Sequence, residues 1–133
     1  PMRPDKQNQK KFDFDMSFGE WGEDTFLHMM GMTRDKFEIK TERNEMWTKW
    51  GNIAVEYQCF DKPSGINATE AAYWVQNLAD RDNDMYCTII FPTATMKKVL
   101  DKMQPRQVKG GDFNKSEMYL VSLADLFSKK AYK

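Results

Sequence analysis

The alternation of apolar and polar residues predicts four strands in this chain. Segments 36–42 and 52–59 both alternate with a period of two residues, and we expect them to pair as a hairpin with a tryptophan-bearing loop. Segment 85–91 is almost continuously apolar, which predicts a strand in the interior of a sheet. A last strand is expected over 118–123.

Apolar residues at three- and four-residue spacing predict four helices. The first is expected from Phe18 to Met30, followed by Gly31 as a stop signal. The others are expected over 67–78, 95–103 and 124–130. This order of elements predicts an α/β (α+β) fold in which helices flank a central mixed β-sheet.

Length and composition favour one packed domain. The chain has 133 residues, and a domain typically has roughly 100 to 200. A hydrophobic content of 41% is enough for a core. Residues 1–11 are polar, mostly basic and without periodicity, so we expect a flexible basic arm before a single domain over 12–133.

Composition also disfavours several classes of protein. Apolar runs are only a few residues long and the first residues lack an apolar signal segment, so we expect a cytoplasmic protein without membrane contact. Cys59 and Cys87 are isolated and His28 is the only histidine, which argues against a zinc site. Because 20 Lys and Arg balance 20 Asp and Glu, nucleic acid would have to bind local basic segments.

The predicted hairpin would separate apolar from charged side chains. Its core face would carry Phe37, Ile39, Ile53, Val55, Tyr57 and Cys59. Its other face would carry Glu38, Lys40, Glu42, Glu56 and Gln58. Carboxylates this close repel one another unless a cation lies between them, and oxygen ligands suit Mg²⁺ or Mn²⁺. The alternative is a solvated face on which Lys40 neutralises the carboxylates.

Glu23 is a further candidate on the first helix. It lies three or four residues from Gly19, Phe26 and Leu27, so its carboxylate is expected on the apolar side of the helix. A buried carboxylate needs a partner or a metal.

A series of segments over about residues 17–126 carries a family resemblance. They are Gly19-Glu20-Trp21-Gly22-Glu23, Phe37-Glu38-Ile39-Lys40-Thr41-Glu42, Gly51-Asn52-Ile53-Ala54-Val55-Glu56-Tyr57, Lys62-Pro63-Ser64-Gly65-Ile66, Thr69-Glu70-Ala71-Ala72-Tyr73-Trp74, Gly110-Gly111-Asp112 and Tyr119-Leu120-Val121. With them the chain resembles the PD-(D/E)XK nuclease superfamily, in particular its small phage and bacterial endonucleases. The resemblance implies a restriction-endonuclease-like core and Mg²⁺-dependent or Mn²⁺-dependent hydrolysis of DNA, including branched or damaged DNA.

The resemblance also implies the metal ligands. Glu56 corresponds to the motif glutamate, and Tyr57 would supply a backbone carbonyl. Either Glu42 or Glu38 corresponds to the preceding strand acid, and Glu23 would be an outer ligand or orient a metal-bound water.

The chain departs from the family motif at Gln58, which stands where the motif has lysine. A glutamine carries no positive charge, although its amide can still orient a water. We expect Lys40 to be the charged helper, because it lies on the same hairpin face. Alternatively, Glu38-x-Lys40 is itself the motif, with Asp35 nearby and Glu56 as an additional ligand.

Basic and polar residues outside the acidic face would contact DNA. The candidates are Lys62, Ser64, Lys97, Lys98, Lys109 and Asn114. Solvated lysines and a plain tight turn are the alternatives. At the level of the whole protein, two alternatives are a nuclease-fold DNA-binding module inactivated at Gln58 and a protein-binding domain. A double-strand cutter needs two active sites, so a homodimer is compatible with the sequence, although no feature demonstrates one.

Overall fold

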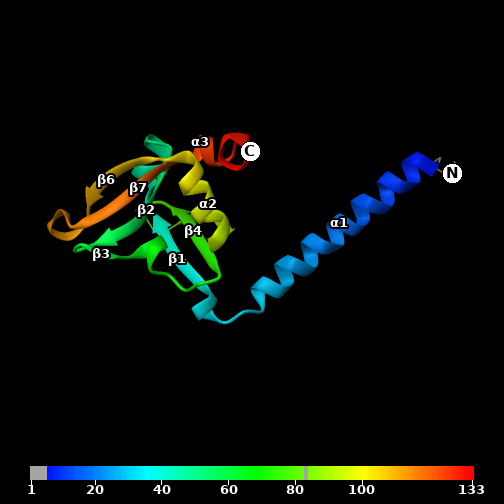
Figure 1. The fold of residues 1–133 in the computed structure, drawn as a ribbon, viewed down its shortest axis with the longest axis horizontal. Helices are drawn as coiled ribbons and strands as arrows, with labels where there is room; N and C mark the ends of the chain where they lie inside the picture. Colours follow the sequence, from blue (N-terminus) through cyan, green and yellow to red (C-terminus); the bar gives the residue numbers. More distant parts are fainter. Residues whose placement is uncertain (1–5, 83) are drawn as a thin grey trace. The chain divides into compact units, whose positions relative to one another are not determined.

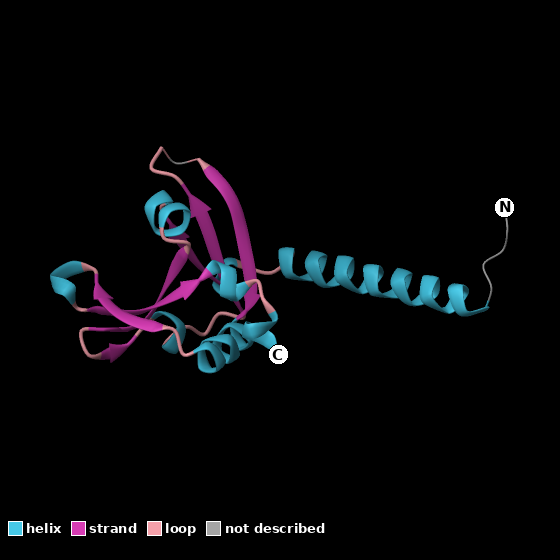
Figure 2. Cartoon of the chain, turned by 90° about the horizontal axis from the view of Figure 1, so that it is seen from above, coloured by secondary structure: helices cyan, strands magenta, loops and turns pink. Residues whose placement is uncertain are grey.

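The computed structural model describes residues 6–82 and 84–133. These residues belong to two compact units, the first ending at Arg34 and the second beginning at Asp35 (Figure 1). The first unit consists mainly of the helix α1 (Lys6–Met30). The strands lie in the second unit (Figure 2).

α1 ends as predicted but begins earlier. At its end, the Gly31 N–H donates to the Leu27 carbonyl oxygen at 3.1 Å. Its start at Lys6 means that residues 6–11, assigned to the arm, are helical. Residues 1–5 of that arm lie outside the described residues.

A mixed three-stranded sheet has the strand order β1-β4-β5. β1 (Phe37–Glu42) runs parallel to the central strand β4 (Tyr73–Ala79). β5 (Met85–Pro92) pairs with β4 in the antiparallel direction. In this register Lys40 lies beside Gln76 on the neighbouring strand.

An antiparallel four-stranded sheet has the order β3-β2-β7-β6. Its strands are β2 (Asn52–Cys59), β3 (Lys62–Pro63), β6 (Arg106–Gly110) and β7 (Ser116–Ser122). The register of β2 and β7 shifts between Glu56 and Gln58, so a β-bulge interrupts β2 next to Glu56.

One hydrophobic core joins the two sheets to helix α2 (Thr93–Met103). Ile53 from the four-stranded sheet, Trp74 from the three-stranded sheet and Met96 from α2 are all fully buried. The short helices α3 (Leu123–Leu126) and α4 (Lys129–Tyr132) add buried side chains to this core. A helical turn at Arg34–Lys36 (η1) precedes β1, and further turns lie between strands at Glu45–Lys49 (η2), Gly65–Asn67 (η3) and Asp112–Asn114 (η4).

The predicted α+β class is confirmed, and so are the helix at 95–103 and the strands around 36–42 and 52–59. The predicted hairpin is wrong, because β1 and β2 belong to different sheets. The helix predicted over 67–78 is also wrong, since residues 73–78 belong to the strand β4. The strand at 85–91 is an edge strand, whereas β4 is interior.

The two faces of β1 are the reverse of those predicted. Paired residues of neighbouring strands point to the same side of a sheet. Glu38, Lys40 and Glu42 are paired with Trp74, Gln76 and Leu78, which are buried. The charged side chains therefore share the inner face of the sheet, whereas Ile39 is 49% exposed. The prediction for β2 is confirmed at Ile53 and Val55, which are fully buried.

Candidate active site

A cavity of about 1260 Å³ lies between β1, β2 and the loop that follows β4. It is lined by Lys40, Thr41, Glu42, Arg43, Glu45, Met46, Ala54, Glu56, Ala79, Asp80, Arg81, Gly111 and Met118. The cavity thus combines carboxylates from both sheets with three basic side chains.

Three of the residues predicted for the site line this cavity together: Lys40, Glu42 and Glu56. A hydrogen bond joins the two strands that carry the carboxylates, because the Ala54 N–H on β2 donates to Glu42 Oε1 at 2.7 Å. Glu42 therefore holds the end of β1 against β2 without a hairpin ladder.

Glu42 is partly withdrawn from water. Burial raises the pKa of its carboxyl above the ordinary value of 4.5, and the hydrogen bond from the Ala54 N–H opposes that rise. Its charged form is thus destabilised in the protein alone. A bound cation would offset that cost.

We expect the substitution Glu42→Gln to stabilise the metal-free protein at neutral pH. Glutamine keeps an oxygen that can accept from Ala54 N–H and has no charge to desolvate. Because the raised pKa makes the folded state bind the proton more tightly than the unfolded state, the contribution of the Glu42 carboxyl to stability falls as pH rises above 4.5. The melting temperature of the variant in EDTA should exceed that of the wild type at pH 7 by a few degrees, and the difference should shrink as pH falls to 4.5. A lower melting temperature at pH 7 would contradict this.

Lys40 brings positive charge to the same face. Its Nζ lies 4.0 Å from Glu38 Oε1 and 5.9 Å from the centre of the Trp74 ring. The ion pair and the aromatic face hold the ammonium group on the inner side of β1. Glu38 does not line the cavity, although it forms an ion pair with Lys40, which does. Of the two candidates for the strand acid, the geometry therefore favours Glu42.

The backbone around Glu56 is packed tightly against Gly65. Gly65 has a φ of +49°, and a Cβ atom there would lie 2.1 Å from the Glu56 carbonyl oxygen. Only glycine avoids both the strained conformation and the clash. Ser64 N–H next to it donates to the Tyr57 carbonyl oxygen at 3.1 Å. The segment after β3 therefore fixes the position of Glu56.

The other predicted metal-site and catalytic residues are not among those that line the cavity. The Tyr57 ring packs against the Tyr119 ring in a tilted arrangement with centroids 4.4 Å apart, and the Tyr57 carbonyl already accepts one hydrogen bond. Gln58 follows the β-bulge and is paired with Glu117. Glu23 is exposed on α1, in the first unit, rather than buried as predicted.

None of the six predicted DNA contacts lines the large cavity. Lys62 on β3, Lys109 on β6 and Asn114 in η4 are exposed, as is Lys98 on α2. The Ser64 Oγ is buried and has no hydrogen-bond partner among the described residues. The glycine turn does reach the cavity, through Gly111.

Two arginines at the cavity were missed as site residues by the sequence analysis. Arg81 forms an ion pair with Glu45, and both side chains are well exposed. Arg43 follows β1 directly. Arginine binds phosphate oxygens through two parallel hydrogen bonds, and an exposed ion pair can be exchanged at little cost. In the sequence, the position of these two residues next to the ends of strands was the signal that could have marked them as site residues.

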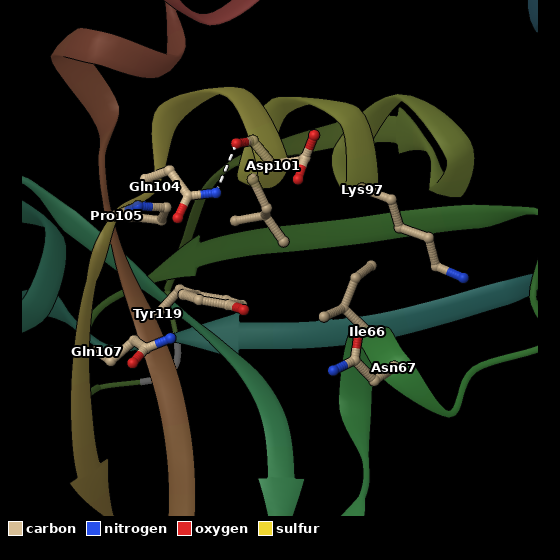
Figure 3. A pocket seen from close by; sticks show the side chains of 9 residues that line it. Ile66, Asn67, Lys97, Asp101, Gln104, Pro105, Gln107 and Tyr119 are labelled. Carbon is tan, nitrogen blue, oxygen red and sulfur yellow. Dashed lines mark hydrogen bonds between the residues drawn. The ribbon is translucent and has the colours of Figure 1, made fainter.

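A second cavity is smaller, with a volume of about 270 Å³. Figure 3 shows the side chains that line it. It lies beside α2, and neither Glu42 nor Glu56 lines it. Tyr119 and Ile66 face each other across it, and Lys97 points away from Asp101 (Figure 3). Tyr119 is the register partner of Val55, so it lies on the opposite face of the sheet from Glu56.

The residues of the large cavity fit a hard divalent cation. No group of three or more His, Cys, Asp or Glu side chains that could hold a metal occurs within the described ranges. Mg²⁺ does not require one, because it is commonly held by one or two carboxylates together with waters and substrate phosphates. Glu42 and Glu56 provide two such carboxylates. Burial raises the pKa of Glu42 and so destabilises its charged form in the absence of a cation.

Comparison with protein-family models, characterised proteins and solved structures gave no match for this chain. Among the described residues, the structure contains no helix with the length and apolar character that a membrane crossing requires.

Proposed function

We propose that this chain is a metal-dependent endonuclease that hydrolyses DNA phosphodiester bonds in the cavity of Lys40, Glu42 and Glu56. The observation that carries the proposal is that these three residues, which the family resemblance also singles out, line one cavity from two different sheets. The three residues line the same cavity even though β1 and β2 do not form the predicted hairpin.

Each residue has a distinct role in this proposal. Glu42 and Glu56 would hold one or two Mg²⁺ or Mn²⁺ ions through carboxylate oxygens. A bound ion lowers the pKa of its water and stabilises charge on the scissile phosphate. Lys40 donates hydrogen bonds to the attacking water or to a phosphate oxygen, as the lysine of the family motif does. Arg43 and Arg81 bind the phosphates that flank the scissile bond.

The proposal favours an active enzyme over an inactive DNA-binding module. The inactive alternative rests on Gln58, which would have removed the catalytic positive charge. Gln58 does not line the cavity, and the Lys40 ammonium on the inner face of β1 supplies that charge instead. Branched or damaged DNA is the proposed substrate, in the cytoplasm of the cell.

The test is cleavage of plasmid and four-way-junction DNA by the purified chain. Cutting is expected with Mg²⁺ and with Mn²⁺, and it should stop when EDTA is added. If neither DNA is cut with either metal but both are bound, the DNA-binding module is the better account. Cutting that persists in EDTA would exclude a metal-dependent mechanism.

A further inference from the structure

The smaller cavity beside α2, which we call the α2 cavity, lies apart from the proposed active site. It is lined by apolar, amide and charged side chains from η3, α2, β6 and β7 (Figure 3). Met118 of β7 lines the large cavity, whereas its neighbour Tyr119 lines the α2 cavity. Successive residues of a strand point to opposite faces of the sheet, so the two cavities lie on opposite faces. The α2 cavity has a volume of about 270 Å³, just below the range of about 300–1,000 Å³ for small-molecule sites, and therefore suits one small group.

An aromatic ring contributes to the lining of the α2 cavity. The Tyr57 ring packs against the Tyr119 ring, with centroids 4.4 Å apart, and holds it in place. Ile66 and Leu100 are buried and add apolar surface to the lining. Unpaired bases stack on aromatic side chains of proteins, because every base has a flat π face. The cavity therefore offers a surface for a base that is ordered before any ligand binds.

Three carboxamide side chains also line the α2 cavity: Asn67, Gln104 and Gln107. A carboxamide can both donate and accept hydrogen bonds, as the edge of a nucleobase does. The side chains of Asn67 and Gln107 make no hydrogen bond within the described part of the chain. Their polar groups are thus free to bind the edge of a base.

Gln104 occupies a backbone conformation in which glycine is the usual residue. It ends α2 with a φ of +49°, and a side chain in this left-handed region costs backbone strain. Its Nε2 donates to the Asp101 carbonyl oxygen at 2.8 Å (Figure 3). The amide nitrogen is therefore occupied, and the amide oxygen is left to accept. The chain thus keeps an acceptor at the cavity, at the expense of a strained helix end.

Two charged side chains complete the lining of the α2 cavity. Lys97 and Asp101 lie one turn apart on α2, and the Lys97 side chain points away from Asp101 (Figure 3). An ammonium group without an acidic partner attracts phosphate, and Lys97 is one of the predicted DNA contacts. The Asp101 carboxylate and the Gln104 amide oxygen both accept hydrogen bonds. Two acceptors favour a base with an exocyclic amino group, such as cytosine or adenine, over thymine or uracil, which lack one.

We propose that the α2 cavity binds one unstacked nucleotide. Its base lies on Tyr119, its exocyclic amino group donates to Asp101 and Gln104, and its phosphate contacts Lys97. The site serves recognition, because it lies on the opposite face of the sheet from Glu56. A free nucleotide and an unpaired nucleotide of DNA share this chemistry. We assign the ligand to DNA, and this assignment alone rests on the proposed function, since branched and damaged DNA expose unpaired bases.

The first test is titration of the ¹⁵N-labelled protein with dCMP and with dUMP in the presence of EDTA. The two pyrimidine nucleotides have the same size, but only cytosine has an exocyclic amino group. The side-chain amide signals of Asn67, Gln104 and Gln107 should shift with dCMP, and dCMP should bind several-fold more tightly than dUMP. If neither nucleotide moves these signals, the nucleotide site does not exist. Equal affinities would exclude the contacts to the amino group.

Two substitutions test the assigned contacts. Lys97→Gln should weaken dCMP binding about fivefold or more, through the lost attraction for phosphate. Lys102→Gln, at an exposed lysine of α2 that does not line the cavity, should leave the affinity unchanged. Equal losses in these two variants would overturn the phosphate contact.

Gln104→Gly separates binding from stability. Glycine relieves the strain at the end of α2 and removes the amide oxygen, so dCMP binding should weaken several-fold while the melting temperature stays the same or rises. Wild-type affinity for dCMP would remove Gln104 from the site. A lower melting temperature would show that Gln104 supports the fold instead.

Competition with dCMP in EDTA identifies the source of the nucleotide. A short single strand of deoxycytidines should displace dCMP from the cavity, and a duplex of the same length should not. If the single strand fails to displace it, the ligand is a free nucleotide and the assignment to DNA is wrong. None of these measurements requires cleavage. A chain that binds dCMP but cuts no DNA would contradict only the proposed function, whereas one that cuts DNA but binds no nucleotide in the α2 cavity would contradict only the present inference.

Discussion

Replacing Glu56 with glutamine is expected to lower the rate of Mg²⁺-dependent DNA cleavage by about three powers of ten or more. A metal ion contributes several kcal/mol of transition-state stabilisation, and each 1.4 kcal/mol is about tenfold in rate. Glutamine preserves the shape of the side chain but loses the charge that holds the ion. Initial rates of plasmid nicking at saturating Mg²⁺ give the measurement.

The fold should survive the Glu56 substitution. The Glu56 side chain makes no hydrogen bond or ion pair among the described residues, so the variant should melt within a few degrees of the wild type. The control is Glu70→Gln, at an exposed glutamate that does not line the cavity, and it should cut at the wild-type rate. A Glu56→Gln protein that cuts within tenfold of the wild type would remove Glu56 from the site.

Gly65→Ala is expected to have the largest effect on stability. Alanine at a φ of +49° costs about 1–2 kcal/mol through backbone strain. A Cβ atom 2.1 Å from the Glu56 carbonyl oxygen also forces the backbone apart, which typically costs another 1–3 kcal/mol. The free energy of unfolding in urea should therefore fall by about 2–5 kcal/mol. Cleavage should fall too, because Glu56 moves.

Gly51→Ala separates the two contributions. Gly51 also has a positive φ, +67°, but nothing lies within 4 Å of its Cβ position. This variant should lose only the strain energy, about 1–2 kcal/mol, and should keep its cleavage activity. Equal losses of stability in the two variants would show that the segment at Gly65 does not press on Glu56.

The elements with one buried face were predictable from the sequence. In α2, the spacing of Met96, Val99 and Leu100 matches a helix, and all three are buried. β4 was not recognised because it is buried on both faces and therefore shows no alternation. Trp74 and Val75 fit a helical spacing equally well, and only pairing with β1 and β5 decides in favour of a strand.

The main members of the site were predictable even though the strand pairing was not. A period of two residues places Lys40 and Glu42 on one side of β1, whichever strand β1 pairs with. The pairing partner of β1 is β4, which lies more than 30 residues further along the chain. No local sequence pattern contains this information. Of the face that the incorrect hairpin gave, Lys40, Glu42 and Glu56 do line the cavity, whereas Glu38 and Gln58 do not.

Residues contributed by the loops and by β4 could not be predicted as members of the site. Arg81 lies in a polar turn and reaches the cavity only through the path of the chain after β4.

The most direct test of the proposed metal site is a crystal soaked in Mn²⁺, with data collected at the manganese absorption edge. The proposal predicts an anomalous peak in the cavity between Glu42 and Glu56, within about 2–2.5 Å of an oxygen of each carboxylate. The peak should disappear in Glu56→Gln crystals soaked in the same way. No peak, or a peak bound to neither carboxylate, would contradict the central claim that this cavity is a metal-dependent active site.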